Sequence, residues 1–302
     1  MIIVFGSVNV DFVTRVEEIP RPGETVLGPN YDVIPGGKGA NQALAARRAG
    51  ATVALAGAVG RDPFAEIGLA LLKAEGVDLS ATEKVDAPTG AAFITVDAKG
   101  ENAITVASGA NAKASASSLS KLTLGEKDIL LMQREVPERE QIVAARIAKE
   151  KGARVILNVA PAGVIAEELA ALINVLIMNE HEAAVVAQGM GLSSDTPETH
   201  ARMIAETRKL TTIVTLGAEG AVGWTDGVRR HIPAFPVDVV DTTAAGDAFC
   251  GAFAAALDRG FGFTSALAQG VAAGSLTCTK AGAQPSLPSS IDIAAKLKHW
   301  NA

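Results

Sequence analysis

The chain has 302 residues, of which 48% are hydrophobic and 20% charged, and its formal net charge is −6. This composition is typical of a well-packed globular enzyme and excludes a disordered or fibrous protein. The negative charge also argues against binding to a nucleic-acid backbone, because such proteins usually present a basic face.

The first residues, MIIVFGSVNVDF, have neither the basic segment nor the apolar core of a signal peptide. Their apolar run is far shorter than the roughly 20 residues that a membrane helix needs. Both cysteines, Cys250 and Cys278, lie in apolar surroundings rich in Ala and Gly, which predicts buried thiols in a reducing compartment. We therefore expect a soluble, cytoplasmic protein.

Short apolar runs alternate with longer amphipathic ones. The predicted strands are Ile2–Val8, Thr52–Ala58, Asp128–Gln133, Arg154–Val159, Val175–Met178 and Thr212–Leu216. They are rich in Val, Ile and Leu without strict polar alternation, as in strands covered on both faces. The predicted helices are Asn41–Ala49, Pro63–Ala74, Glu138–Lys151 and Glu182–Ala187. This order predicts one domain over residues 1–302, a three-layer α/β/α fold with a mostly parallel central sheet.

Two segments interrupt this alternation. Val10–Val33 contains three prolines, and Gly90–Val106 contains two strand-like runs joined by the turn Lys99-Gly-Glu-Asn. We predict that they form a small β-sheet over the ends of the main strands. This sheet, built from about residues 10–34 and 88–108, is called the lid below. A surface hairpin with no function is the alternative.

The segment DTTAAGDAF, residues 241–249, precedes a predicted helix, since Phe249 and Phe253 are spaced i, i+4. Asp247 then falls in the first turn, beside the free N–H groups of Ala245 and Gly246. These donors and the helix dipole form an anion hole suited to a transferring phosphoryl group. A carboxylate at that position predicts a base for a substrate hydroxyl. The alternative is that Asp247 only caps the helix.

A second motif is PGGKGANQ, residues 35–42. Its glycines permit close approach of the backbone to a ligand, and Lys38 and Asn41 add donors suited to a polyol. The segment is not a Walker A loop, because Asp32 and Gly39 stand where that pattern needs Gly and Ser or Thr. By itself, a glycine-rich turn is also explained as an ordinary strand-to-helix connection.

A third motif is Asn9-Val-Asp11, directly after the first predicted strand. Two short polar side chains at alternate positions point the same way, at the edge where open parallel sheets bind ligands. A turn-forming role is the alternative.

Together these segments resemble the ribokinase-like (PfkB) family of carbohydrate kinases, and the resemblance runs essentially end to end. The matching stretches are VFGSVNVDF, PRPGET, PGGKGANQA, LLMQRE, LNVAPA, MNEHEA, TLGAEG, DTTAAGDAF and KAGAQPS. GGKGAN, DTTAAGD and GAQPS are most similar to the ribokinase branch of the family. The resemblance implies transfer of the γ-phosphate of ATP to the O5 hydroxyl of D-ribose. Another sugar or a nucleoside is the alternative substrate, with Phe12 and Phe93 as the candidate wall for a base. A catalytically silent sugar-binding protein is the alternative class.

The resemblance also implies roles for individual residues. The catalytic group comprises Asp247 as base with Gly246 and Ala245. The sugar site comprises Asn9, Asp11, Gly37, Lys38, Asn41, Glu135 and Asp247, where Asn9, Asp11 and Glu135 supply acceptors for hydroxyls. The nucleotide site comprises Asn179, Thr215, Gly217, Gly220 and Gly246, and Glu182 helps to place Mg²⁺ through water. A monovalent cation, K⁺, is held mostly by backbone carbonyls at Asp241, Thr243, Thr277, Lys280, Gly282 and Ser286. For Asp241 the alternative is a helix cap.

Relatives in this family pair their lids in a homodimer. A small sheet with an apolar outer face has to bury that face. We expect Val13, Val33, Phe93 and Ile104 to supply it.

Overall fold

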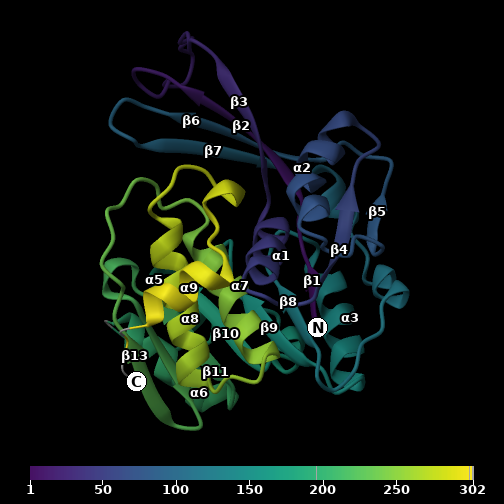
Figure 1. Ribbon diagram of the computed structural model, residues 1–302, viewed down its shortest axis with the longest axis vertical. Helices are drawn as coiled ribbons and strands as arrows, with labels where there is room; N and C mark the ends of the chain where they lie inside the picture. The colour runs from purple at the N-terminus through teal and green to yellow at the C-terminus, as the bar shows by residue number, and fades with distance from the viewer. Residues whose placement is uncertain (195, 299, 301–302) are drawn as a thin grey trace.

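The computed structural model describes residues 1–194, 196–298 and 300. Its central sheet has nine strands in the order β13-β12-β11-β10-β9-β8-β1-β4-β5 (Figure 1). Their bounds are β1 Ile2–Phe5, β4 Val53–Val59, β5 Thr82–Lys84, β8 Ile129–Met132, β9 Arg154–Asn158, β10 Val175–Asn179, β11 Thr211–Thr215, β12 Ala221–Thr225 and β13 Val228–Ile232. All neighbours are parallel except at β12 and β13. The predicted mostly parallel sheet is confirmed.

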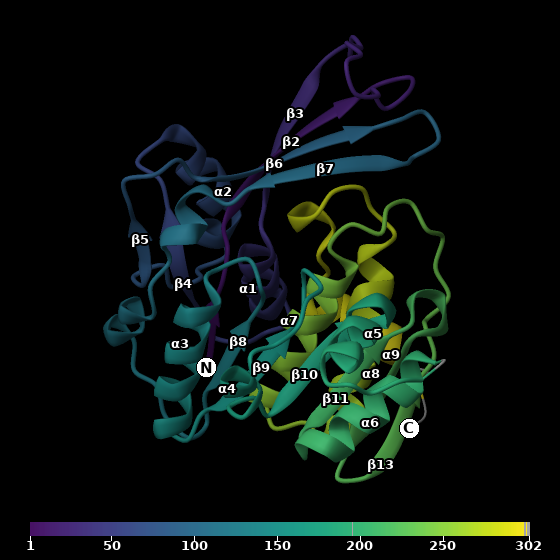
Figure 2. The same cartoon turned by 180° about the vertical axis from the view of Figure 1, so that it is seen from behind.

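Helices cover both faces of this sheet. The helices are α1 Lys38–Arg48, α2 Pro63–Ala74, α3 Glu138–Glu150, α4 Glu167–Ala170, α5 Glu180–Gly189, α6 Pro197–Arg208, α7 Ala245–Asp258, α8 Phe263–Thr277 and α9 Ser290–Leu297. Figure 1 faces the layer of α1, α7, α8 and α9, and Figure 2 faces the layer of α3, α4, α5 and α6. Within β1, Ile2 and Val4 pack toward the first layer and Ile3 and Phe5 toward the second. Both faces of the strand are therefore core, which explains its apolar run.

Some predicted boundaries are wrong. The strand predicted over Ile2–Val8 ends at Phe5, and a second strand, β2 (Asn9–Arg15), follows it, so that Asn9 and Asp11 belong to a strand of the lid. The helix predicted from Asn41 begins at Lys38. The antiparallel strands β12 and β13 were not predicted. Their connection, Asp226-Gly227, has φ of 50° and 73°, the positive values of a tight hairpin turn, and this dipeptide was an available signal.

The lid is a separate four-stranded sheet in the order β3-β2-β6-β7, with β3 Tyr31–Gly36, β6 Gly90–Val96 and β7 Asn102–Ala107. It projects beyond the carboxyl end of β1, from which β2 follows (Figures 1 and 2). Asn9 and Gly36 are cross-strand partners at the base of the lid. The turn after β3 depends on Gly37, since it has a φ of 90° and an added Cβ would lie 2.6 Å from the Asn9 nitrogen.

The four residues predicted to form one apolar face of the lid do not all lie on the same face. Register pairs Phe12 with both Val33 and Phe93, whereas Val13 pairs with Ile94, which pairs with Ile104. Neighbouring residues of a strand point to opposite faces. Val33 and Phe93 therefore lie on one face, and Val13 and Ile104 lie on the other.

Aromatic side chains gather on the face that carries Phe12. The Phe12 ring stacks on Phe93 at 5.4 Å between centroids, meets Phe64 of α2 edge-on at 5.3 Å, and lies 6.4 Å from Tyr31. Phe93 is 52% exposed and Tyr31 67% exposed. The opposite face carries Asp11 and turns toward the end of the central sheet. We call the Phe12 side the outer face of the lid.

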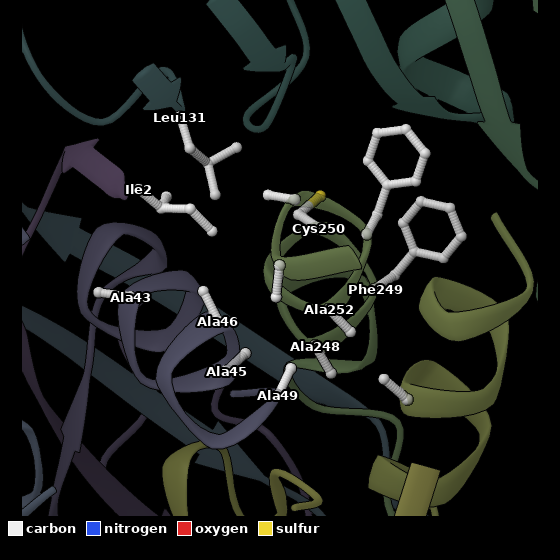
Figure 3. Close-up of a cluster of buried hydrophobic side chains, with 14 of the residues drawn as sticks. Ile2, Ala43, Ala45, Ala46, Ala49, Leu131, Ala248, Phe249, Cys250 and Ala252 are labelled. Atoms are coloured by element: carbon white, nitrogen blue, oxygen red, sulfur yellow. The ribbon is translucent and has the colours of Figure 1, made fainter. Parts of the chain in front are cut away.

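Helices α1 and α7 pack unusually closely, and Figure 3 shows alanines from both at their contact. Ala45 and Ala46 of α1 and Ala248 and Ala252 of α7 are all buried. A Cβ added at Gly251 would lie 2.5 Å from the Ala45 Cβ and 2.7 Å from the Gln42 carbonyl oxygen. Small side chains therefore bring the two helix backbones together.

Among the described residues, no helix combines the length and apolar character needed to cross a membrane.

Candidate active site

Asp247 is the third residue of α7, and its side chain is 8% exposed. Its Oδ2 accepts a hydrogen bond from Asn41 Nδ2 at 3.0 Å, and its Oδ1 accepts one from Gln42 Nε2 at 2.9 Å. The N-cap of α7 is Ala244, without a side-chain capping bond. Asp247 is therefore held by helix α1 and does not cap its own helix. Burial raises the pKa of its carboxyl, against the opposing effects of the Lys38 ammonium and the two amides.

The start of α7 provides donors, but they differ from the predicted pair. The N–H of Ala245 donates to the Thr242 carbonyl at 3.2 Å and is not free. Within the described part of the chain, the N–H groups of Gly246 and Asp247 have no such partner. Ala244 just before them has a φ of 61°, a strained backbone conformation for alanine. The N–H groups available to an anion are therefore those of Gly246 and Asp247, whereas the Ala245 N–H, predicted to be free, is hydrogen-bonded.

Two cavities meet at this helix end. The larger, of about 520 Å³, is lined by Thr215, Gly217, Gly220 and the apolar side chains of Phe249 and Val271. The smaller, of about 170 Å³, is lined by Lys38, Asn179, Glu182, Asp247 and Cys250. Thr215, Thr242, Ala245 and Gly246 line both. All five residues predicted to contact a nucleotide therefore line one connected space, and Gly246 lies at its junction.

Glu135, which lies in the segment after β8, fixes the turn before α1. Its Oε2 accepts hydrogen bonds from Ser7 Oγ at 2.6 Å and from the Lys38 backbone N–H at 3.2 Å. Ser7 Oγ in turn accepts the N–H of Gly39 at 3.2 Å. Glu135 therefore has a structural role in addition to any contact with a sugar.

Asp11 and Lys38 complete the charged part of the site. Burial, with the nearby Glu135 carboxylate, raises the pKa of Asp11 to about 6. Burial alone would lower the pKa of the Lys38 ammonium, but the carboxylates of Asp247, Glu135 and Glu182 outweigh that effect and raise it. Lys38 thus stays charged among three carboxylates, close to where phosphate charge would enter.

Asn9 is oriented by Asn111, a buried residue at the end of the lid. The Val8 backbone N–H can only donate, and it meets Asn111 Oδ1 at 2.9 Å. Asn111 Nδ2 must then donate to Asn9 Oδ1, at 2.7 Å. This leaves the Nδ2 group of Asn9 free to face a ligand. Asn9 therefore has a free donor in addition to the predicted acceptor oxygen, of which Asn111 occupies one lone pair.

The proposed magnesium position is chemically suitable. Asn179 and Glu182 form a capping box at the start of α5, with Glu182 Oε2 accepting the Asn179 N–H at 2.7 Å. Burial raises the pKa of Glu182, so a cation near it would be stabilising. Its carboxylate lines the smaller cavity with Asp247. Hard oxygen ligands of this kind suit Mg²⁺ held partly through water.

Asp241 joins two of the loops predicted to hold a monovalent cation. Its Oδ1 accepts from the N–H and hydroxyl of Thr243 at 2.9 and 2.6 Å, and its Oδ2 accepts from the Gly282 N–H at 2.8 Å. Burial would raise the pKa of Asp241, but these hydrogen bonds outweigh it and lower the pKa. The helix-cap alternative is wrong, because Ala244 is the cap.

The other predicted cation ligands lie close by. The N–H of Lys280 donates to the Thr277 carbonyl at 3.3 Å. The hydroxyls of Thr277 and Ser286 donate to the carbonyls of Ala273 and Ala283, at 2.9 and 2.7 Å. Their side chains are therefore engaged locally. The backbone carbonyls of these loops, rather than their hydroxyls, are therefore the groups that could bind a cation beside Asp241.

Several residues of the site had not been predicted. Ser7, Gln42, Asn111, Gln133 and Asn158 are all buried and all hydrogen-bonded to predicted residues or to one another. Four of them lie inside stretches that resemble the family: Ser7 in VFGSVNVDF, Gln42 in PGGKGANQA, Gln133 in LLMQRE and Asn158 in LNVAPA. No spacing within those stretches distinguishes them from their neighbours, and Asn111 lies in none of them.

Comparison with known proteins extends this picture. A family model described as pfkB family carbohydrate kinase matches residues 1–290. The ribokinase of Haemophilus influenzae is 39% identical over 300 residues and covers 98% of both chains. The structure of ribokinase from Thermotoga maritima superposes with a TM-score of 0.89, at 35% identity over 99% of each chain. That of Arabidopsis thaliana ribokinase complexed with ribose and ATP has a TM-score of 0.88, at 31% identity over 98% of each chain. Each similarity extends over nearly the whole chain.

Proposed function

The chain belongs to the pfkB family of carbohydrate kinases, and we propose that it phosphorylates D-ribose at O5 with ATP, using Asp247 as the general base. One observation carries this proposal. Asp247 lines the smaller, polar cavity, and Gly246 beside it lines both that cavity and the larger one proposed for a nucleotide. Within the described part of the chain, the N–H groups of Gly246 and Asp247 have no hydrogen-bond partner. A space for the phosphoryl donor, an anion hole and a base therefore lie next to one another, as phosphoryl transfer from ATP to a hydroxyl requires.

In this proposal each group has one role. Asp11 and Glu135 accept hydrogen bonds from sugar hydroxyls, and the Asn9 amide donates one. The O5 hydroxyl lies between Asp247 and the γ-phosphate. As the new O–P bond forms and the bond to the β-phosphate breaks, Asp247 takes the hydroxyl proton late in the transfer. Lys38 and the Gly246 N–H neutralise the charge on the moving phosphoryl group.

We propose that Glu182 helps to place Mg²⁺ through water, and that K⁺ binds between the Asp241–Thr243 and Lys280–Gly282 loops. When bound, Mg²⁺ supplies charge neutralisation at the phosphates. The cation at Asp241 would order the loop that carries the anion hole, since that loop leads directly into α7. Cys250 and Cys278 are free thiols, which supports the proposed cytoplasmic location.

The structure of the lid argues against a nucleoside as the substrate. Phe12 and Phe93, the candidates for a wall against a base, stack on each other. Both lie on the outer face, whereas Asp11 points from the opposite face toward the site. They therefore do not line the space beside Asp247.

A coupled ADP-release assay tests the proposed function. With Mg·ATP and a panel of D-ribose, 2-deoxy-D-ribose, hexoses and nucleosides, D-ribose should have the highest kcat/KM. Replacing Na⁺ by K⁺ should raise kcat by about fivefold or more, which corresponds to an activation free energy lower by about 1 kcal/mol. Asp241→Asn should remove that stimulation. A nucleoside as the best substrate would contradict the sugar site, and no turnover at all would favour the sugar-binding protein.

Binding of the sugar should depend on pH through Asp11. Burial raises the pKa of Asp11 to about 6. Below that pH the carboxyl is protonated and loses acceptors for hydroxyl groups. We expect KM for the sugar to rise about tenfold from pH 7 to pH 5, since each pH unit below the pKa lowers the ionised fraction about tenfold. Asp11→Asn should bind the sugar more weakly at both pH values, with this dependence abolished. An unchanged dependence in the variant would show that another group titrates.

We propose that the protein is a homodimer joined through the outer face of the lid. Tyr31 and Phe93 are exposed there beside Phe12, and an apolar surface of this kind favours burial against a second copy. Sedimentation velocity at micromolar concentration should give a dimer, and Phe93→Asp should give a monomer. A monomeric wild-type protein would contradict the proposal.

A further inference from the structure

Gln42 stands behind the proposed base and is wholly buried. Its Nε2 donates to Asp247 Oδ1 at 2.9 Å and to Asn158 Oδ1 at 3.0 Å. Its Oε1 accepts from Gln133 Nε2 at 2.7 Å. Both hydrogens of the amide nitrogen and one lone pair of its oxygen are therefore engaged. These contacts connect the ends of β8 and β9 to the start of α7 through one side chain of α1.

The direction of this amide is determined by its neighbours. Asn158 Nδ2 donates to the Ile177 carbonyl at 3.2 Å, and a carbonyl can only accept. Asn158 must then present Oδ1 to Gln42, and the Asp247 carboxylate also presents only acceptors. If the Gln42 amide turned over, its oxygen would face two acceptors at once. Only one orientation satisfies the network, with both donors on the side of Asp247 and Asn158.

We propose that Gln42 is a positioning residue for the phosphoryl transfer, which holds the Asp247 carboxylate in its ionised form and in one orientation. Asn41 holds the other oxygen, so that two consecutive amides of α1 immobilise both carboxylate oxygens. The lone pairs that remain are then left for the sugar hydroxyl. This inference rests on the proposed role of Asp247 as base.

Loss of the Gln42 donor should change how Asp247 titrates. Burial raises the pKa of Asp247, and Lys38, Asn41 and Gln42 oppose that rise. A hydrogen bond to the charged form lowers an acid's pKa, so removing one donor raises it further. Because the base must be ionised, activity should then be lost at a higher pH than in the wild type.

The test compares pH profiles of kcat at saturating D-ribose, because the titration of Asp11 already makes KM for the sugar depend on pH. Gln42→Met keeps the length of the side chain and removes the amide. It should lower kcat by about 10- to 100-fold, since a misplaced reacting group can cost about 100-fold. The acidic limb of the profile should move up by about one pH unit. The Kd for the sugar, from calorimetry, should stay within about threefold.

Two further variants separate positioning from stability. Gln141→Met removes another buried glutamine amide. Gln141 lies in α3 and donates to the Val136 carbonyl at 2.8 Å, and it is not hydrogen-bonded to Asp247 or to Gln42. It should lower the thermal stability and leave the pH profile unchanged. Gln133→Met keeps both amides on Asp247 but frees the Gln42 oxygen, and should move the acidic limb in the same direction by a smaller amount.

A wild-type pH profile in folded Gln42→Met overturns the inference. If that variant does not fold, a wild-type profile in folded Gln133→Met overturns it instead. The parent proposal fails separately, if Asp247→Asn keeps wild-type kcat. If Asp247→Asn is inactive but Gln42→Met and Gln133→Met have wild-type pH profiles, Asp247 remains the proposed base. Only the positioning role of Gln42 is then contradicted.

Discussion

Asp247→Asn should lower kcat by about 10²- to 10⁴-fold, the range that a positioned general base contributes. The substitution keeps the shape of the side chain and removes the atom that takes the hydroxyl proton. KM for ATP and for the sugar should change by only a few-fold, because the cavities and the Gly246 N–H remain. The measurement is ADP release under saturating Mg·ATP and D-ribose, with calorimetry for binding.

Stability gives an independent check on this variant. Burial raises the pKa of Asp247, which means that its ionised form costs free energy in the folded protein. Asparagine removes that cost but places its own amide near two amide donors, so we expect a change of unfolding free energy within about 1 kcal/mol.

Asp258→Asn is the matched control, at the other end of α7, where Asp258 pairs with the N-terminal ammonium at 2.7 Å. It should keep kcat. Loss of activity in Asp258→Asn equal to that in Asp247→Asn would point to damage to α7 and not to a missing base.

Gly251→Ala should lower both stability and kcat, although this residue touches neither cavity. The added Cβ would lie 2.7 Å from the Gln42 carbonyl oxygen and 2.5 Å from the Ala45 Cβ, so α1 and α7 must separate. Overpacking of this kind costs about 1–3 kcal/mol of unfolding free energy. Separation also moves Asn41 and Gln42 away from Asp247, and a shift of about 1 Å can cost about 100-fold in rate. Denaturant unfolding and ADP release measure the two effects.

Gly262→Ala is the control for this substitution. Gly262 precedes α8, has an ordinary φ of −67°, and has nothing within 4 Å of an added Cβ. It should change stability by less than about 1 kcal/mol and leave kcat unaltered. If Gly251→Ala is as active as Gly262→Ala, the close contact of α1 with α7 does not position the base.

Local patterns predicted the mostly parallel central sheet and the helix that begins just before Asp247. Apolar runs such as Ile2–Phe5 identify strands buried on both faces, because both layers of helices pack on alternate residues of the run. Spacing along DTTAAGDAF places Asp247 in the first turn of α7, as observed. These inferences depend on neighbours a few residues apart, which the chain itself brings together.

Predictions that depended on how two strands pair, or on which distant group accepts a hydrogen bond, were less successful. Val13, Val33, Phe93 and Ile104 were placed on one face of the lid, but register divides them between two. Register is set by pairing and cannot be read from one strand. Likewise, the N–H of Ala245 is bonded to the Thr242 carbonyl, through a turn whose backbone conformation the residue types do not specify.

The sequence by itself thus determined which groups are present and at which strand or helix end they lie. Only the tertiary structure decided which of them meet. Asn41 and Gln42 reach Asp247 across 206 and 205 residues of chain. They do so because Ala45, Ala46 and Gly251 let two helix backbones approach closely enough for short amides to span the gap. That contact depends on how well the surfaces of the two helices fit together, so the residue pattern of either helix alone does not predict it.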